Sequence, residues 1–163
     1  MKRFSQHPVG AATCRPPFRS CIILCILLIL VLVPGQSTYA APMLYNAQDV
    51  DKLQTFLLYE EYGTSNASRL GWDALDPETW AGAEWDEEGG EQRLARLDIS
   101  YSTYYARLYG SLDLSGCEYL RELSCDSAYW ITELDVSTCT SLKELSCRTN
   151  DLISLNLSGC NAL

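Results

Sequence analysis

Leucines recur at an even step in the last third of the chain. Leu112, Leu134 and Leu155 each begin a pair of apolar residues separated by one polar residue, and they lie 22 and 21 residues apart. Leu123 and Leu145 fall between them, so that successive steps are 11, 11, 11 and 10 residues. The alternation within each pair indicates a short strand that is buried on one side. A fixed period of this length predicts stacked units, because one unit alone cannot bury its apolar row.

This spacing resembles the leucine-rich-repeat family (Leu-x-x-Leu-x-Leu-x-x-Asn/Cys-x-Leu). The nested step of 10 or 11 residues is similar to a bacterial variant in which each repeat contains two similar halves. The resemblance covers about a third of the chain and amounts to barely two and a half repeats, whereas solenoids usually need three or more. It implies an α/β fold: a leucine-rich-repeat solenoid of short parallel strands with a helical N-terminal cap. The cap is expected over residues 41–92 and the repeats over residues 93–163.

Residues 46–62 are predicted to form the helix of this cap. Asn46 can cap the helix, and Gly63 supplies its stop. The apolar residues on its predicted inner face are Val50, Leu53, Phe56 and Leu57. Asp76-Pro77 can open a second short helix, since aspartate is a favourable cap and proline a favourable first helical residue. The acidic residues 84–91 contain Gly89-Gly90, which fits a turn between two strands.

Aromatic residues fall before and at the start of the predicted repeats. Trp72, Trp80 and Trp85 either pack in the cap or form a platform for sugar stacking, and packing is the favoured interpretation. The tyrosine-rich residues 101–109 have two equally supported interpretations. They adapt the first repeat to the cap, or they form a patch that faces a partner.

The first 40 residues are predicted to be a secretory signal. Lys2, Arg3, Arg15 and Arg19 precede an apolar run at 21–33, and Ala40 ends a small-residue cleavage site. The run of about 13 residues is shorter than the ~18–20 residues that span a bilayer. We therefore expect cleavage after Ala40 and a protein that is secreted or held at the cell surface, with no membrane contact after removal of the signal.

The remaining chain is strongly acidic. Eight basic and 21 acidic residues follow Ala40, which gives a formal net charge of −13. Such a balance argues against nucleic acid and anionic membranes as partners.

Five cysteines follow Ala40, and they keep the step of the leucines: Cys117, Cys139 and Cys160 in one series, Cys125 and Cys147 in the other. Side chains in register on neighbouring strands lie ~4.8 Å apart, which is long for a disulfide. These five cysteines show no short paired spacing of the kind that binds zinc. We expect buried thiols that act as small apolar residues, with no metal and no cofactor.

The polar residues that alternate with the buried leucines are the predicted binding face. One row contains Asp113, Ser115, Asp135, Ser137, Asn156 and Ser158, and the other contains Glu122, Ser124, Asp126, Glu144, Ser146 and Arg148. For any single residue of these rows, the favoured interpretation is a soluble side chain compatible with a turn. As a group they are the candidate face, and a protein ligand is predicted to bind through one row together with Tyr119, Tyr129 and Trp130. The sequence does not give the identity of this ligand.

An enzyme is not expected. The only histidine, His7, lies in the predicted signal, and no catalytic motif is found, so that no catalytic residue is assigned. The function predicted is an extracellular protein-binding or adhesion module without catalysis of its own. The alternative is the non-catalytic front segment of a larger secreted enzyme or of a carbohydrate-binding surface protein.

The last repeat has no closing cap after Leu163, which would leave a strand edge and an apolar row in water. Two explanations stay open: the sequence is part of a longer protein, which we favour, or the chain associates with itself end to end.

Overall fold

The structure, a computed structural model, describes residues 43–101 and 105–163, all within one compact unit, Ala40–Leu163. The predicted signal, residues 1–40, therefore lies outside the described residues. The helical elements are α2 (Ala47–Leu58), α3 (Asn66–Leu70) and the 3-10 helix η2 (Pro77–Thr79). The strands are β1 (Glu60–Glu61), β2 (Thr64–Ser65), β3 (Ala83–Glu88), β4 (Glu91–Asp98), β5 (Leu108–Asp113), β6 (Glu122–Ser124), β7 (Tyr129–Asp135), β8 (Glu144–Ser146) and β9 (Ser154–Asn156). In the described part, no helix has the length and hydropathy to cross a membrane.

Helix α2 begins as the sequence predicts. The Asn46 side chain accepts hydrogen bonds from the backbone N–H groups of Gln48 and Asp49 at 3.1 and 3.2 Å, which satisfies two amides at the helix start. The helix ends at Leu58 rather than at residue 62, because Tyr59 adopts an extended backbone conformation. The residues that follow form the small hairpin of β1 and β2 instead of another helical turn.

The strands form three sheets. β1 and β2 pair with each other, and β3, β4, β6 and β8 form a four-stranded sheet in that order. β5, β7 and β9 form a parallel three-stranded sheet. Only β3 is antiparallel in the four-stranded sheet, because it is joined to β4 by the tight turn at Gly89-Gly90 that the sequence predicts. Below, the four-stranded sheet is called sheet A and the three-stranded sheet is called sheet C.

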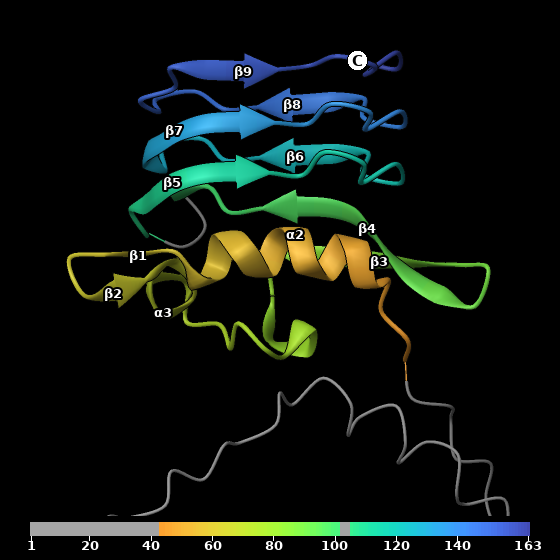
Figure 1. Cartoon of the computed structure of the whole chain (residues 1–163), viewed down its shortest axis with the longest axis horizontal. Coiled ribbons are helices and arrows are strands. Elements are labelled where there is room, and N and C mark those ends of the chain that lie inside the picture. The colour runs from red at the N-terminus through yellow and green to blue at the C-terminus, as the bar shows by residue number, and fades with distance from the viewer. Residues whose placement is uncertain (1–42, 102–104) are drawn as a thin grey trace, which may run out of the picture. The chain divides into compact units, whose positions relative to one another are not determined.

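The chain crosses between sheets A and C at every half repeat. Leu97, Leu123 and Leu145 are register partners in sheet A, whereas Leu112, Leu134 and Leu155 are register partners in sheet C. The 11-residue step of the sequence is therefore the number of residues along the chain from a leucine of one sheet to the next leucine of the other sheet. The parallel strands of sheet A, β4, β6 and β8, run opposite to β5, β7 and β9 of sheet C, with α2 across the end of the stack beside β4 and β5 (Figure 1).

The expected fold class, a leucine-rich-repeat solenoid of short parallel strands with a helical N-terminal cap, is wrong for this structure. Among the described residues there are only two α-helices, of 12 and five residues, and three separate sheets that are antiparallel, mixed and parallel. These described residues form no closed solenoid. The physical reason lies in residues 59–98: two antiparallel pairings occur there, and one of them supplies the edge of sheet A.

One apolar core lies between sheets A and C and extends under α2. Trp80 is 1% exposed and Trp72 is 7% exposed, and Trp85 packs against the same core, so that packing, not sugar stacking, accounts for the three tryptophans. Inward leucines of both sheets belong to this one cluster, so the outward side chains of the two sheets point away from each other.

Candidate functional site

The structure divides the predicted binding face between two opposite surfaces. Asp113, Asp135 and Asn156 are register partners in sheet C. Glu122 and Glu144 are register partners in sheet A. Because these sheets cover opposite sides of one core, a single flat partner cannot contact both rows.

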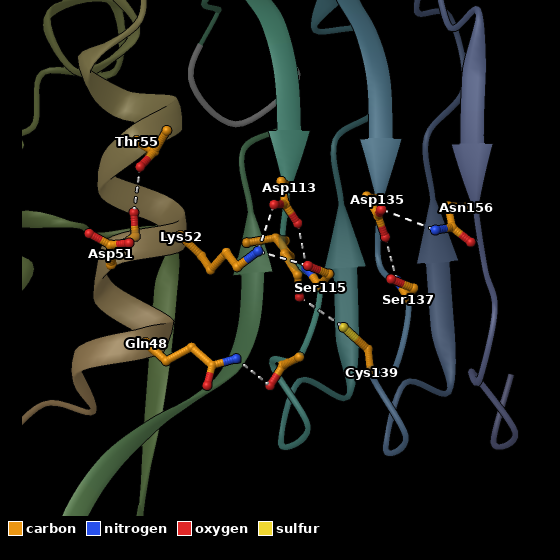
Figure 2. Close-up of polar contacts among 12 residues, drawn as sticks. Gln48, Asp51, Lys52, Thr55, Asp113, Ser115, Asp135, Ser137, Cys139 and Asn156 are labelled. Carbon is orange, nitrogen blue, oxygen red and sulfur yellow. Dashed lines mark hydrogen bonds and ion pairs between the residues drawn. The ribbon is translucent and has the colours of Figure 1, made fainter.

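The row on sheet C forms a ladder of turns at the strand ends. Asp113, Asp135 and Asn156 each accept a hydrogen bond from the backbone N–H two residues later, at 2.8, 2.8 and 3.1 Å. The N–H donors belong to Ser115, Ser137 and Ser158. Asn156 Nδ2 also donates to Asp135 Oδ2 at 3.0 Å, which ties one strand end to the next (Figure 2). These side chains therefore make hydrogen bonds that stabilise the turns of the fold.

Helix α2 contributes a cation to the same ladder. Lys52 Nζ donates to Asp113 Oδ2 at 2.6 Å and to Ser115 Oγ at 2.7 Å (Figure 2). Burial raises the pKa of Asp113, but the hydrogen bonds from Lys52 and Ser115 outweigh burial, so the net pKa lies below its usual value. The pKa of Asp135 is likewise lowered, since hydrogen bonds from Ser137 and Asn156 outweigh burial. Both carboxylates therefore stay ionised as acceptors.

Part of the row on sheet A also makes hydrogen bonds within the fold. Asp126 accepts hydrogen bonds from Ser146 Oγ and from the Arg148 N–H, both at 2.6 Å. Asn150 Nδ2 donates to the carbonyl of Cys125 at 2.8 Å and to that of Cys147 at 3.1 Å. These contacts connect successive turns, so they hold the repeats together rather than point to a ligand.

The outward face of sheet A contains a shallow hollow of about 270 Å³. Its lining residues are Arg96, Glu122, Leu123, Ser124, Glu144, Leu145 and Ser146. Arg96 pairs with Glu84 at 3.0 Å and with Glu122 at 3.1 Å. Glu144 is the register neighbour of Glu122 and has no ion-pair partner among the described residues. The hollow is thus polar and acidic at its β8 side, with no aromatic residue in its lining.

The outward face of sheet C carries an aromatic stack at the starts of its strands. The rings of Tyr109 and Trp130 lie 6.1 Å apart between centroids with an angle of 5° between their planes. Tyr62 makes an edge contact with Tyr109 at 5.9 Å, and the Arg69 guanidinium lies 4.6 Å from the Tyr109 centroid. We call Tyr62, Arg69, Tyr109 and Trp130 the aromatic cluster. Tyr62 is 84% exposed and Trp130 is 42% exposed, so the cluster presents large rings to solvent.

A buried asparagine holds this cluster in place. Asn66, 1% exposed, accepts a hydrogen bond from the Tyr109 N–H at 3.0 Å and donates to the Tyr109 carbonyl at 2.9 Å. It also donates to the carbonyl of Phe56 at 2.9 Å. The first strand of sheet C is thereby fixed to α2 and α3, which gives Tyr109 a rigid position.

Tyr62 occupies an unusual backbone position for an aromatic residue. It has φ 53° at the turn between β1 and β2, followed by Gly63 with φ 71°. Positive φ at both residues suits a two-residue hairpin, but glycine or asparagine is the favourable residue at the first position and a bulky side chain is strained there. A large ring at this site is neither buried nor favoured locally, which points to a role for the ring on the surface.

The three aromatic residues of the predicted face lie at two different ends of the strands. Tyr129 and Trp130 begin β7, and Tyr129 makes an edge contact with Tyr101 at 5.3 Å. Tyr119 follows the far end of β5, where the guanidinium of Arg93 lies 4.6 Å from its ring centroid. Trp130 therefore belongs to the aromatic cluster and Tyr119 does not.

The cysteines of the described chain are free thiols, and the expectation that they are buried is confirmed for three of the five. Cys117, Cys125 and Cys139 are buried, whereas Cys147 and Cys160 are partly exposed. Burial raises the pKa of Cys125 and of Cys139 to about 12 and also raises that of Cys117, so these three thiols stay protonated near neutral pH. Within residues 43–101 and 105–163, no group of histidine, cysteine or acidic side chains is placed to hold a metal ion.

Two residues that form or hold the aromatic cluster, Asn66 and Tyr62, were not predicted as site residues. Asn66 gives no periodic signal, because its partners are 10 and 43 residues away in the chain. Tyr62 stands before Gly63, and this pair fits a helix stop as well as a hairpin turn. Comparisons of the chain with protein-family models, curated proteins and solved structures gave no match.

Proposed function

We propose that the chain is an exported, non-catalytic protein-binding module whose partner docks on the aromatic cluster of sheet C. The observation that carries the proposal is the stack of Trp130 on Tyr109 with Tyr62 exposed beside it. Trp, Tyr and Arg are the residues most enriched in binding hot spots, since rigid rings bury much area and lose little conformational entropy. The support for export is the predicted signal at residues 1–40.

The arrangement of rings favours a protein over a sugar as the ligand. Arg69 and Trp130 both lie over the Tyr109 ring, at 4.6 and 6.1 Å from its centroid. A sugar stacks on a free ring face, whereas the central ring of the cluster already contacts these two side chains. What remains open is one face of Trp130, the ring of Tyr62 and the ring edges. Protein side chains of mixed chemistry fit such a surface better than a flat sugar ring does.

The absence of catalysis is part of the proposal. The carboxylates of Asp113 and Asp135 accept hydrogen bonds within the turn ladder and have lowered pKa values, so neither is suited to act as a general acid near neutral pH. The buried thiols are protonated, and a protonated thiol is a poor nucleophile.

Selection from a library of displayed peptides on the full chain tests the proposal. The peptides recovered on the unchanged protein are measured again on Trp130→Ala and on Leu75→Ala. Leu75 is a matched control, because it is 75% exposed and apolar and lies outside the cluster. We expect Trp130→Ala to weaken binding about 30-fold, the size of a hot-spot residue. Equal binding to the unchanged protein and to Trp130→Ala would contradict the proposal, and recovery of glycans instead of peptides on an array would favour the carbohydrate alternative.

A further inference from the structure

Arginine-on-tyrosine contacts recur in this structure. Arg69 lies over Tyr109 at 4.6 Å, and Arg107 lies over Tyr129 at 5.9 Å. A third pair, Arg93 over Tyr119, is described above. The positively charged guanidinium is attracted to the negative face of an aromatic ring, and its planar shape allows it to stack there.

Trp130, which stacks on Tyr109, has no such cation over its own ring among the described residues. Tryptophan binds cations over its face better than tyrosine does, yet no arginine or lysine of the described chain lies over Trp130. Its one face is against Tyr109, so the other face is the one that an approaching group meets. β9 begins at Ser154, whose register partner on β7 is Glu133, so no β9 residue is a register partner of Trp130, and Trp130 is 42% exposed. Arg69 lies over Tyr109, and Tyr109 stacks on Trp130. This stack therefore ends at the partly exposed ring of Trp130.

An exposed carboxylate lies on the same side of β7 as Trp130. Glu133 is exposed and lies on the outward side of β7, as Trp130 does, because their register partners Ser111 and Tyr109 both face outward from β5. Among the described residues Glu133 has no ion-pair partner. The chain after Ala40 also has a formal net charge of −13, which steers a cationic group toward it.

We propose that the partner of this module contributes an arginine that stacks on the open face of Trp130, with Glu133 as its carboxylate. The inference rests on the proposed function and names the chemistry of the partner: an extended protein segment with an exposed arginine. Arginine is favoured over lysine, because its planar guanidinium can stack on the indole and at the same time donate two hydrogen bonds to a carboxylate. The completed stack is Arg69, Tyr109, Trp130 and the arginine of the partner.

A small probe tests this inference without a known partner. Blocked arginine and blocked citrulline are titrated separately into the full chain, and the indole N–H signal of Trp130 is followed by NMR and assigned with Trp130→Phe. Citrulline has nearly the same shape as arginine but no charge. We expect arginine to shift the Trp130 signal several times more than citrulline does, and Glu133→Gln to reduce the arginine effect about threefold. Equal shifts from the two probes would overturn the inference.

Selected peptides distinguish failure of this inference from failure of the proposed function. In a peptide whose binding depends on Trp130, replacement of its arginine by citrulline is expected to weaken binding about tenfold, and replacement by lysine about threefold. Binding that depends on Trp130 but is unchanged by citrulline would overturn the inference and leave the proposed function standing. If no peptide depends on Trp130, both are wrong. Glu87→Gln, which removes one exposed carboxylate on β3 in the other sheet, is the control for a general effect of charge.

Discussion

The outward faces of sheets A and C come from equivalent positions of one sequence repeat, yet their chemistry differs. Sheet C carries the aromatic cluster, whose central ring is fixed between Arg69 and Trp130. Sheet A carries a charge row in which Arg96 joins Glu84 and Glu122, and Glu144 remains without a cation among the described residues. Rigid rings can be desolvated at low cost, whereas exposed charges hold water and gain little from pairing. The comparison teaches that a repeat can supply two faces of which only one is suited to strong binding.

β4 of sheet A and β5 of sheet C are each anchored by one buried polar side chain from a helical segment. Asp49 of α2 is fully buried and accepts hydrogen bonds from Arg93 Nε at 2.8 Å and from the Leu94 N–H at 3.0 Å, both on β4. Asn66 of α3 makes the corresponding contacts with Tyr109 on β5. The predictions below test what each anchor and each face contributes.

The largest effect is expected from loss of the anchor of sheet A. Asp49→Ala leaves Arg93, whose side chain is only 16% exposed, without its carboxylate, and removes the acceptor of the Leu94 N–H. Breaking a buried pair on one side costs about 3–5 kcal/mol. Urea unfolding measures the change, with Asp51→Ala, an exposed residue of the same helix, as the control. A loss below about 1 kcal/mol, the size of an ordinary surface change, would contradict this account of the anchor.

Loss of the anchor of sheet C is expected to have the next largest effect. Asn66→Ala leaves the N–H of Tyr109 and the carbonyls of Tyr109 and Phe56 without these partners, and unsatisfied buried groups cost about 2–3 kcal/mol in total after partial relaxation. The same change should weaken Trp130-dependent binding, because Tyr109 loses its fixed position. Asn161→Ala, at an exposed asparagine, is the control. A variant that is destabilised but binds as before would show that the rigidity of Tyr109 is unimportant.

The turn ladder of sheet C is expected to give the structure a dependence on acidic pH. The folded-state pKa values of Asp113 and Asp135 lie below their ordinary value of 3.8, so the unfolded chain takes up protons first as the pH falls. The stabilisation by these carboxylates is present above pH ~4 and is lost as the pH falls through the folded pKa values. Asp135→Asn should flatten the acid side of the stability profile and cost about 1 kcal/mol at pH 7. An unchanged profile in this variant would contradict the role of the ladder.

The smallest effect is expected on the outward face of sheet A. Glu144→Lys replaces a like charge in register with Glu122 by an opposite one, which should stabilise the fold by about 0.2–1 kcal/mol. Thermal unfolding at low salt detects the change, and added salt should reduce it. Charge reversal at both Glu122 and Glu144 should leave peptide binding within twofold, because these residues and Trp130 are on opposite sides of the core. A loss of binding in the double variant would move the functional face to sheet A.

Local features of the fold were predictable from the sequence, and long-range ones were not. The Asn46 cap, the Gly89-Gly90 turn and the packing of Trp72 and Trp80 follow from residue types and spacing over a few positions. The period shows which residues are equivalent, but it does not show that alternate half repeats belong to opposite sheets. The candidate residues therefore lie on two opposite surfaces, and the sequence did not show which of the two rows the predicted ligand would contact. The anchoring role of Asn66 could not be predicted, because a single buried asparagine belongs to no periodic pattern in the sequence.

The most direct test of the central claim compares the two faces within one complex. A photo-crosslinking amino acid is placed at Tyr62 in one variant of the full chain and at Glu144 in another, and each is irradiated with a peptide whose binding depends on Trp130. The account predicts a covalent product from position 62, with the attachment mapped by mass spectrometry next to the arginine of the peptide, and little product from position 144. Equal products from the two positions, or a product from position 144 alone, would contradict the claim that the aromatic face of sheet C is the binding surface.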